Sequence, residues 1–523
     1  MAKADVIPSS ARIWTGFAMM CLGMFMAILD VQVVATSIPT IQTALNVRPD
    51  QMSWIQTAYL IAEVVAIPLT GFLTRVLTLR WLFVGAITVF TLASLACAAS
   101  GNFESLIAAR VVQGFAGGTL IPAVFSAVFL MFPPGRQGLA TTIAGVLAVL
   151  APTVGPIVGG WITDTYSWHW LFLINALPGL LAATLGAMTL PAETARPSEL
   201  RRVDGAGLAL IAMALASLVV ALKEAPSRGW LSVVVLGLLA FSAVALALFV
   251  RRSLRVPDPV VNLRTLGDVG FATGCALSFV LGIGLFGSVY MMPVFLARVH
   301  GLTAFDLGQV MLVTGVAQLV TAPLAVYLEE RTDPRLLSLF GFVLFAVGLG
   351  MSAFQTVDTG FAEMVWPQII RGVAIMFCLL PPTRMALGHL AADKVPDASG
   401  LFNLMRNLGG AIGLALIDSV LYGLAPGYGA AILVRLQAGD QATAQALGLP
   451  PGVLPAQPMT AALDATMRAY LMPLVEKLAF VQAMNAAWAV VALITLAAAV
   501  TLPVLAMLRQ RRGTVRTDGG IKG

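Results

Sequence analysis

Charged residues are scarce in this chain of 523 residues. Asp, Glu, Lys and Arg make up 11% of it, whereas hydrophobic residues make up 59%. Soluble globular domains carry about 25% charged residues, so the composition excludes a soluble domain and predicts a protein embedded in lipid. The formal net charge of +6 would suggest nucleic acid in a soluble protein. In a membrane protein basic residues set the orientation, and we expect no nucleic-acid partner.

Cysteine and histidine are also few. The four cysteines all lie within apolar runs, which predicts packing roles rather than a disulfide framework. The three histidines are scattered and give no metal-ligand spacing. No nucleophile–base pattern and no phosphate-binding loop of the P-loop type occurs in the sequence. These absences predict a protein that is not an enzyme, holds no metal or cofactor, and draws its energy from a gradient rather than from ATP.

What the chain has in abundance is apolar blocks of roughly 18–30 residues, near the length that a bilayer requires. These blocks fall at 14–38, 54–73, 81–100, 104–131, 138–163, 168–190, 205–222, 229–250, 270–297, 303–328, 335–355, 361–390, 400–424 and 478–508. The sequence therefore predicts fourteen transmembrane helices, and the even number places both termini on one side. Most of the 31 Lys and Arg residues then lie in segments on that side. By the positive-inside rule, both termini are predicted to be cytoplasmic.

A weak internal repeat relates the early blocks to the late ones. Pro68-Leu69 and Arg80 recur as Pro323-Leu324 and Arg335, at a constant offset of 255 residues. Such parallel repeats are typical of transporters whose two halves share one fold.

The repeat predicts three regions. We expect a six-helix half at 1–190, a linker with two additional membrane helices at 191–269, and a second six-helix half at 270–523. The last region is expected to contain an external loop at 425–477 and a cytoplasmic tail. Within that loop, the moderately amphipathic stretch 459–476 is compatible with a surface helix.

Three ionisable residues interrupt the apolar blocks of the first half: Asp30, Glu63 and Arg110. Ionisable groups inside a bilayer cost about 2.5–3.5 kcal/mol each on insertion scales and are functional candidates by default. At the repeat offset Glu63 corresponds to Gln318, so the second half keeps a polar group there but loses the titratable one. We expect Asp30 and Glu63 to include a proton-binding group, with Arg110 shifting its proton affinity by electrostatic proximity.

Each of these residues also has a structural alternative. A buried ion pair such as Asp30 with Arg110 can lock a bundle without any further role. For Arg371 and Asp418, which lie in apolar blocks of the second half, the structural role is favoured.

Several motifs lie within the blocks. In the run Gly155-Pro156-x-x-Gly159-Gly160, proline and glycine bend a membrane helix and permit close backbone approach to a neighbour. Three further runs accompany it: Leu29-Asp30-Val31-Gln32-Val33-Val34, Arg110-Val111-Val112-Gln113-Gly114 and Asn403-Leu404-Met405-Arg406-Asn407-Leu408-Gly409-Gly410. Together they resemble the signatures of the fourteen-span drug:proton antiporters of the major facilitator superfamily (EmrB/QacA-like), closest to the EmrB branch. The resemblance implies an all-α integral membrane protein with two six-helix halves plus two extra helices. It assigns Gly155, Pro156, Gly159 and Gly160 to the antiporter motif.

The loop after the second block departs from that superfamily's pattern. The usual run is Gly-x-Leu-x-Asp-Arg-x-Gly-Arg, whereas the run from Gly71 to Arg80 has Arg75 in place of the aspartate. A gating salt bridge that rests on this aspartate therefore cannot be transferred to the chain.

The resemblance implies a proton-coupled antiporter that exports lipophilic small molecules or drugs across the cytoplasmic (inner) membrane. A dedicated exporter of one metabolite or organic acid, with Arg110 holding an anion, remains an alternative; an uptake symporter or a membrane sensor is less favoured. The implied partners are the small-molecule substrate, protons, membrane lipid and, in a host with two membranes, a periplasmic adaptor protein and an outer-membrane channel. Adaptable Met, aromatic and amide side chains are expected to line the substrate cavity: Met24, Phe25, Gln113, Phe115, Phe279, Phe286, Tyr290, Met291, Gln318 and Asn407.

Overall fold

The structure, a computed structural model, describes residues 10–46, 54–192, 204–257, 259–450 and 465–518. Within these ranges the chain is helical and forms no β-strand, which confirms the all-α prediction. The α-helices are α1 (Ser10–Ala44), α2 (Trp54–Ala66), α3 (Thr70–Ala98), α4 (Phe103–Met131), α5 (Pro134–Thr165), α6 (Trp170–Leu173), α7 (Ala176–Thr189), α8 (Gly205–Arg228), α9 (Val233–Arg255), α10 (Val269–His300), α11 (Ala304–Arg331), α12 (Pro334–Met351), α13 (Phe361–Leu387), α14 (Val395–Gln437), α15 (Gln441–Ala446) and α16 (Ala465–Asp518). Short 3₁₀ segments are η1 (Ile67–Leu69), η3 (Leu263–Gly267) and η4 (Ser352–Phe354).

Short capped connections separate several of the long helices. The side chain of Asn102 accepts a hydrogen bond from a backbone N–H in the first turn of α4, and Asp268 does the same for α10. Thr303 and Asp306 form a reciprocal capping box at the start of α11. Such caps satisfy backbone donors that the helix itself leaves free, so these helices begin where the polar residues stand.

The number of membrane spans depends on how two bent segments are counted. Twelve helical stretches are long and apolar enough to cross a membrane, and the bent helix α5 adds a thirteenth. One of the twelve, Trp54–Ala98, is 45 residues long, more than twice the about 20 residues that one span needs. It breaks at Thr78, whose φ of 75° is not helical. Ile55 and Cys97, from its two arms, both hydrogen-bond to side chains in one turn of α4. The arms are therefore two antiparallel spans, and the count reaches the fourteen that the sequence predicts.

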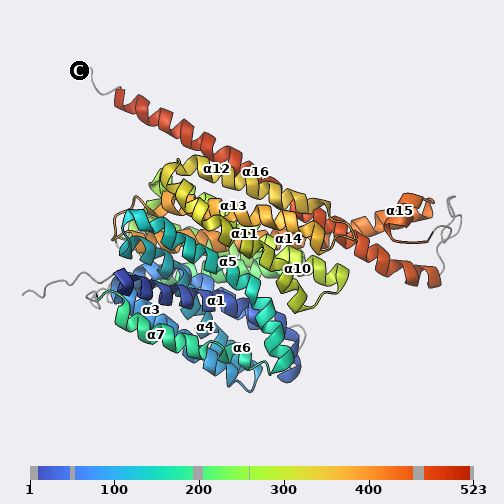
Figure 1. Cartoon of the computed structure of the whole chain (residues 1–523), viewed down its shortest axis with the longest axis horizontal. Coiled ribbons are helices and arrows are strands. Elements are labelled where there is room, and N and C mark those ends of the chain that lie inside the picture. The colour runs from blue at the N-terminus through green and yellow to red at the C-terminus, as the bar shows by residue number, and fades with distance from the viewer. Residues whose placement is uncertain (1–9, 47–53, 193–203, 258, 451–464, 519–523) are drawn as a thin grey trace, which may run out of the picture.

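The early and the late helices have their own apolar cores, and a further cluster that includes Val64, Phe271 and Leu401 joins them. Two clusters of buried side chains draw on α1 to α7, and the largest cluster draws mainly on α10 to α14 and α16. Figure 1 shows α1, α3, α4 and α7 on one side of the bundle and α12, α13 and α16 on the other. Between them α5 and α11 pack against each other. This is the arrangement of two helical halves expected from the internal repeat.

The repeat is visible in the packing itself. A Cβ atom built on Gly114 of α4 would lie 2.3 Å from the carbonyl oxygen of Tyr59 on α2. A Cβ atom on Gly372 of α13 would lie 2.5 Å from the carbonyl oxygen of Thr314 on α11. Tyr59 and Thr314 stand at the same offset of 255 residues that the sequence shows. Both halves thus use a glycine to bring the same pair of helices into backbone contact.

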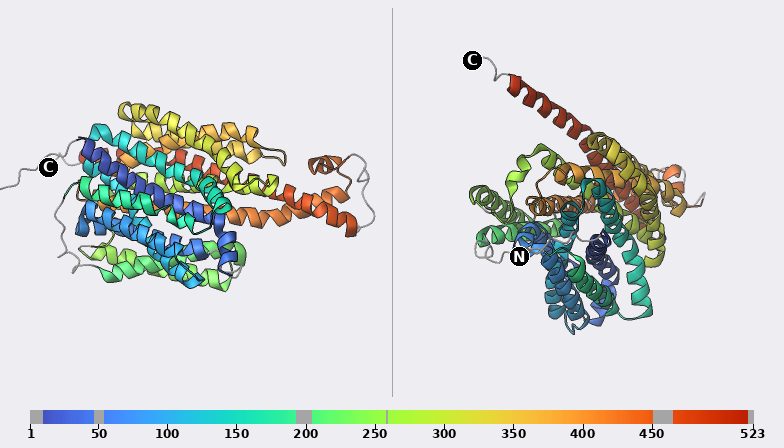
Figure 2. Two further views of the ribbon diagram at one scale, coloured as in Figure 1. Left: turned by 60° about the horizontal axis from the view of Figure 1, so that its bottom comes forward. Right: turned by 60° about the vertical axis from the view of Figure 1, so that its left-hand side comes forward.

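The hairpin α8–α9 lies at the edge of the bundle (green in Figure 2). Helix α8 packs on α2 and α14, and the Ser242 hydroxyl of α9 donates a 2.8 Å hydrogen bond to the Ala214 carbonyl of α8. The other face of α9 is apolar and open; Val233, for example, is 87% exposed. The hairpin therefore adds to the periphery of the two halves. Residues 193–203 of the predicted linker lie outside the described residues.

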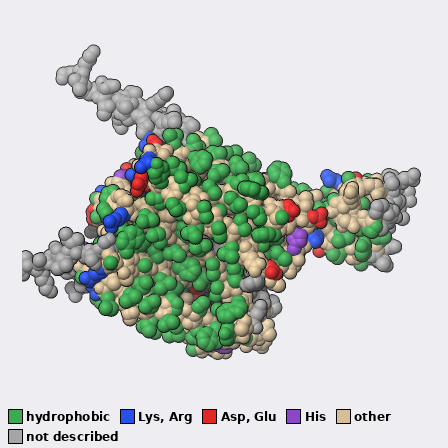
Figure 3. Space-filling model, in the orientation of Figure 1, with side chains coloured by type: hydrophobic (Ala, Val, Ile, Leu, Met, Phe, Trp, Pro, Cys, Tyr) green, Lys and Arg blue, Asp and Glu red, His purple; other side chains and the backbone are tan. Residues whose placement is uncertain are grey.

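The surface is that of a protein in lipid. Apolar side chains cover the flank of the bundle, and charged side chains gather towards its two ends (Figure 3). A continuous apolar surface of this extent is not found on soluble monomers. We call the end at which α1 begins the N-terminal end of the bundle.

The predicted external loop 425–477 is largely helical in the structure. Helix α14 continues to Gln437, α15 follows, and α16 begins at Ala465. These segments form a helical arm that projects from the opposite end of the bundle (Figure 1), and its core contains Ile432, Leu436, Leu471 and Val475. The segment is too polar to be read as a span, yet its apolar residues recur at helical spacing. Residues 451–464, including the start of the predicted stretch 459–476, lie outside the described residues.

Candidate functional site

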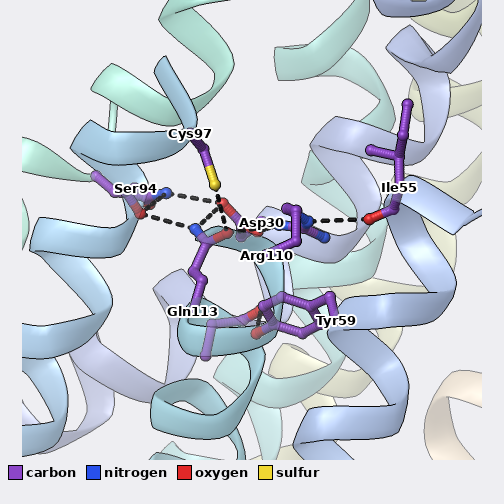
Figure 4. A network of polar contacts seen from close by, with 9 residues as sticks. Asp30, Ile55, Tyr59, Ser94, Cys97, Arg110 and Gln113 are labelled. Atoms are coloured by element: carbon purple, nitrogen blue, oxygen red, sulfur yellow. Dashed lines mark hydrogen bonds and ion pairs between the residues drawn. The ribbon is translucent and has the colours of Figure 1, made fainter. Parts of the chain in front are cut away.

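A buried ion pair joins α1 to α4. Arg110 Nη1 donates to Asp30 Oδ2 over 2.5 Å, and both side chains are completely shielded from solvent. The same Nη1 atom donates to Gln113 Oε1 over 2.7 Å, one turn further along α4. Figure 4 shows the three side chains converging between the helices. The structure therefore brings together three of the residues that the sequence predicts.

The second oxygen of Asp30 is held by amides. Asp30 Oδ1 accepts hydrogen bonds of 2.9 Å from Gln113 Nε2 and from Asn175 Nδ2, the latter directly before α7. Both amide nitrogen atoms also contact the Ser94 hydroxyl of α3, at 2.7 and 3.3 Å. One carboxylate thus ties α1 directly to α4 and to Asn175, and the two amides connect it to Ser94 of α3. Charge-assisted bonds of this kind are stronger than neutral ones and cooperate in a low dielectric.

Arg110 makes two further contacts. Its Nε atom donates to the Ile55 carbonyl of α2 over 3.1 Å. Its guanidinium carbon lies 4.3 Å from the ring centroid of Tyr59, whose hydroxyl donates to the Ala27 carbonyl of α1. Removing one partner of a buried ion pair costs about 3–5 kcal/mol, because the remaining charge is left uncompensated. The Asp30–Arg110 pair therefore connects α1, α2 and α4.

Glu63 does not join this network. Its side chain is buried one helical turn from Tyr59 on α2, but within the described part of the chain no hydrogen bond or ion pair links it to Asp30 or Arg110. Two members of the network, Ser94 and Asn175, were not among the predicted site residues. Their signal in the sequence is that of a polar side chain inside an apolar block, which also fits an ordinary hydroxyl or amide bonded to its own helix.

The antiporter run lies where α5 bends. The axes of Pro134–Pro152 and Val154–Thr163 are inclined by 40°. At the bend a Cβ atom on Gly155 would lie 2.3 Å from the Cβ atom of Gln32 on α1. One turn beyond Gly159, the Thr163 hydroxyl contacts the Ser37 hydroxyl of α1 over 2.5 Å. The run thus brings α5 against the helix that carries Asp30.

The residues predicted to line a substrate cavity are dispersed. Met24 and Met291 are fully buried in the cores of the first and second halves, so in this structure they pack against their own half and face no cavity. Gln113 and Gln318 are also buried, whereas Phe115 is 41% exposed. Partial burial is found for the other five: Phe25, Phe279, Phe286, Tyr290 and Asn407.

A cavity of about 820 Å³ opens at the N-terminal end between α5 and α13. None of the ten predicted cavity residues lines it. Its polar wall contains Glu329, which pairs with Arg384 over 2.9 Å, and Asp268, which contacts His389 over 2.9 Å. The cavity draws on both halves and on charged side chains near the helix ends, which lie beyond the apolar centre of the sequence blocks.

The two halves also contact each other directly. Arg75, near the end of the second span, forms an ion pair with Asp397 in the first turn of α14. A Cβ atom on Gly71 would lie 2.5 Å from the Cα atom of Asp397, and the Ser399 hydroxyl donates to the Pro122 carbonyl of α4 over 2.8 Å. Arg75 replaces the expected aspartate, and the acidic partner stands on the other half. The structure thus shows an ion pair between the halves that uses Arg75 as its basic member.

Two repeated helical halves with a cavity between them are typical of secondary transporters. The sequence model of the Major Facilitator Superfamily matches residues 20–414. The chain belongs to the Major Facilitator Superfamily and is a multi-pass membrane protein.

Named relatives and a solved structure agree with this assignment. The chain is 38% identical over 410 residues to the colistin resistance protein EmrB of Acinetobacter baumannii, covering 78% of this chain and 80% of that protein. It is 31% identical over 404 residues to the multidrug export protein EmrB of Escherichia coli, covering 76% and 78%. The crystal structure of the human organic anion transporter MFSD10 aligns with a TM-score of 0.59 over 94% of this chain and 100% of that chain. At 14% identity that last likeness shows the fold alone.

Proposed function

We propose that the chain is a proton-coupled antiporter that exports lipophilic small molecules or drugs across the cytoplasmic membrane. Membership of the superfamily supports secondary transport, and the names of both EmrB relatives support export of toxic compounds. The observation that carries the proton coupling is the Asp30–Arg110 pair, because a carboxylate enclosed by three helices and held by directed donors changes the packing when it gains a proton.

The coupling step follows from the donors around Asp30. In the ionised state Asp30 accepts from Arg110, Gln113 and Asn175. Protonation removes the charge that compensates Arg110 and places an O–H among groups that already donate. The bonds between α1 and its neighbours weaken, and α1 can shift relative to α4. Glu63, buried nearby on α2, is the second proposed proton site.

The available energy is sufficient for export. One proton moving inwards supplies about 2.3 kcal/mol per 100 mV of membrane potential and about 1.4 kcal/mol per pH unit. A tenfold concentration ratio of a neutral substrate costs about 1.4 kcal/mol. One proton per molecule therefore sustains a ratio of roughly a hundredfold at such gradients.

The remaining proposals concern topology and partners. We infer that both termini are cytoplasmic, which the distribution of Lys and Arg supports. We also infer that 1–190 and 270–523 rock against each other, with 191–269 as an addition at the edge. In a host with two membranes, the resemblance to the EmrB branch supports a periplasmic adaptor protein and an outer-membrane channel as partners. With this orientation, the helical arm lies on the external side.

Efflux from energised vesicles tests the proposal. The full chain is reconstituted into liposomes, a pH gradient is imposed, and movement of a lipophilic fluorescent dye is followed. We expect Asp30→Asn and Glu63→Gln to slow gradient-driven transport about tenfold or more, while Glu224→Gln, which alters a surface ion pair of α8, leaves it unchanged. Wild-type rates in both single variants and in the double variant would falsify the assignment of the proton site. Absence of gradient-dependent flux in the wild type would instead point to a sensor.

A resistance and metabolite screen of a deletion strain separates the two kinds of exporter. A multidrug exporter protects against several unrelated compounds. A dedicated exporter of one organic acid retains a single compound in the cell and leaves drug sensitivity unchanged.

A further inference from the structure

The second half contains a buried arginine with unused hydrogen-bonding capacity. Arg371 of α13 is only 3% exposed. Its Nε atom donates to the Pro367 carbonyl over 3.3 Å, and Nη2 contacts the Met292 sulfur over 3.6 Å. Its guanidinium carbon lies 4.9 Å from the ring centroid of Trp488. In the described part of the chain, the Nη1 atom has no hydrogen-bond partner.

This arginine also lacks an anionic partner. Across the described ranges no carboxylate forms an ion pair with Arg371, whereas Arg110 in the first half is paired with Asp30. A guanidinium stays protonated in proteins, so burial cannot neutralise it. A sulfur atom, a carbonyl oxygen and an aromatic face attract the cation but do not compensate its charge. An uncompensated buried charge is strongly unfavourable, so an anion from outside the chain would stabilise this site.

A small cavity lies against the same side chain. It has a volume of about 20 Å³, and Arg371 lines it together with Ser288, Met292 and Thr314. This volume is enough for a particle of about the size of one water molecule. On α13 the Nε2 atom of Gln368 has no partner among the described residues, although Thr314 donates to its Oε1 atom over 3.1 Å. A cation, hydroxyl groups and a free amide donor thus occupy one region between α10, α11 and α13.

We propose that Arg371 and this cavity form an anion subsite in the second half, which binds one compact monovalent anionic group. A water molecule fills such a space but leaves the guanidinium charge uncompensated. An anion fills the space and also compensates the charge. Two sources share this chemistry: free chloride, and the carboxylate of a transported molecule that enters the cavity with one oxygen atom. The second source rests on the proposed export function and extends its substrate class to lipophilic carboxylic acids. Arg110, which the sequence suggested as an alternative anion-binding residue, is already neutralised by Asp30.

Thermal unfolding of the purified full chain in detergent tests the subsite without any transport. Tm is measured at constant ionic strength in sodium chloride, in sodium octanoate below its micelle-forming concentration, and in sodium gluconate, whose polyhydroxyl chain is a poor match for the apolar lining residues Leu285, Val289 and Met311. Ligand binding to the folded state raises Tm in a saturable way, and we expect a rise of about 2–4 °C in chloride or octanoate over gluconate. We expect Arg371→Gln to abolish the rise. The matched control Arg298→Gln, in the last turn of α10 where the guanidinium packs over Phe480, should keep it.

The outcomes separate the sources and the alternatives. A response to chloride alone assigns a free ion, and a response to octanoate assigns the carboxylate of a substrate; both support the subsite. Equal Tm values of the wild type in all three salts refute it, and so does a response that persists in Arg371→Gln. If that variant does not accumulate, Thr314→Val removes a polar wall of the cavity and should weaken the anion response. If the chain shows no dye efflux, the Tm results still decide whether the subsite exists. If the Tm results refute the subsite, the dye efflux still decides the proposed function.

Discussion

We expect the Arg75–Asp397 pair to hold the N-terminal end of the bundle closed. Reversing either charge should therefore make this end open more often. The pair joins the two halves at a point where Gly71 allows backbone contact, and its side chains are 30% and 13% exposed. Two unit charges about 4 Å apart attract by about 4 kcal/mol at an effective dielectric of about 20. Partial solvent contact and lost side-chain entropy lower the net value to about 1–2 kcal/mol. This corresponds to a shift of roughly 5–30-fold in the ratio of closed to open states.

The assay uses a cysteine introduced at a position that the contact between the two halves buries. Ser399 is fully buried and donates to the Pro122 carbonyl across the two halves, so a maleimide reaches Ser399→Cys only when they separate. We expect Arg75→Glu and Asp397→Arg each to raise the labelling rate about 5–30-fold, as computed from the pair energy. The four native cysteines are buried, and the chain without Ser399→Cys gives the background.

The double exchange, Arg75→Glu with Asp397→Arg, is the critical variant. It restores attraction between the halves, so labelling should return towards the wild-type rate. Recovery should be incomplete, because a cation in the first turn of α14 opposes the helix dipole that favours Asp397. Arg228→Glu, which breaks a surface pair within α8, should have no effect. Labelling of the double variant as fast as that of either single variant would show that the pair does not hold the end closed.

Two further predictions concern glycine contacts. Gly114→Ala places a methyl group 2.3 Å from the Tyr59 carbonyl and should lower the free energy of unfolding by about 1–3 kcal/mol, seen as a lower Tm; Gly85→Ala, which meets nothing within 4 Å, should leave Tm unchanged. Gly155→Leu should force α5 away from Gln32 on α1, slow gradient-driven efflux and let protons leak, whereas Gly155→Ala should be milder. Wild-type efflux in Gly155→Leu would mean that the bend in α5 is not functional.

The sequence is informative about spans because hydropathy is a local property. A block of about 20 apolar residues has few alternatives to a transmembrane helix, and the structure has a helix at each predicted block. Loops are less predictable. The segment 425–477 has no transmembrane hydropathy, and only the packing of α14 on α16 reveals that most of its described residues are helical.

Candidate residues could be found individually, but their partners could not. Asp30 and Arg110 stand out because charge is rare in an apolar block. Ser94 and Asn175 are common residue types whose role depends on which helix faces them. Arg75 breaks a sequence pattern, and the compensating Asp397 lies 322 residues away. Such pairings depend on how the helices pack. The spacing of residues along the sequence does not reveal this packing.

The two halves retain the same packing but not the same charges, and the reason is physical. Gly114 and Gly372 are needed in both halves, because the close contact of α2 with α4 recurs between α11 and α13. A buried charge has a cost in each half where it occurs, and in the proposed function one proton-binding cluster couples the movement of both halves. The first half holds Arg110 with Asp30; the second holds Arg371 without an acid. In the proposed arrangement the first half carries its own anion and the second takes one from solution, so that a proton would act on the first half and a ligand on the second.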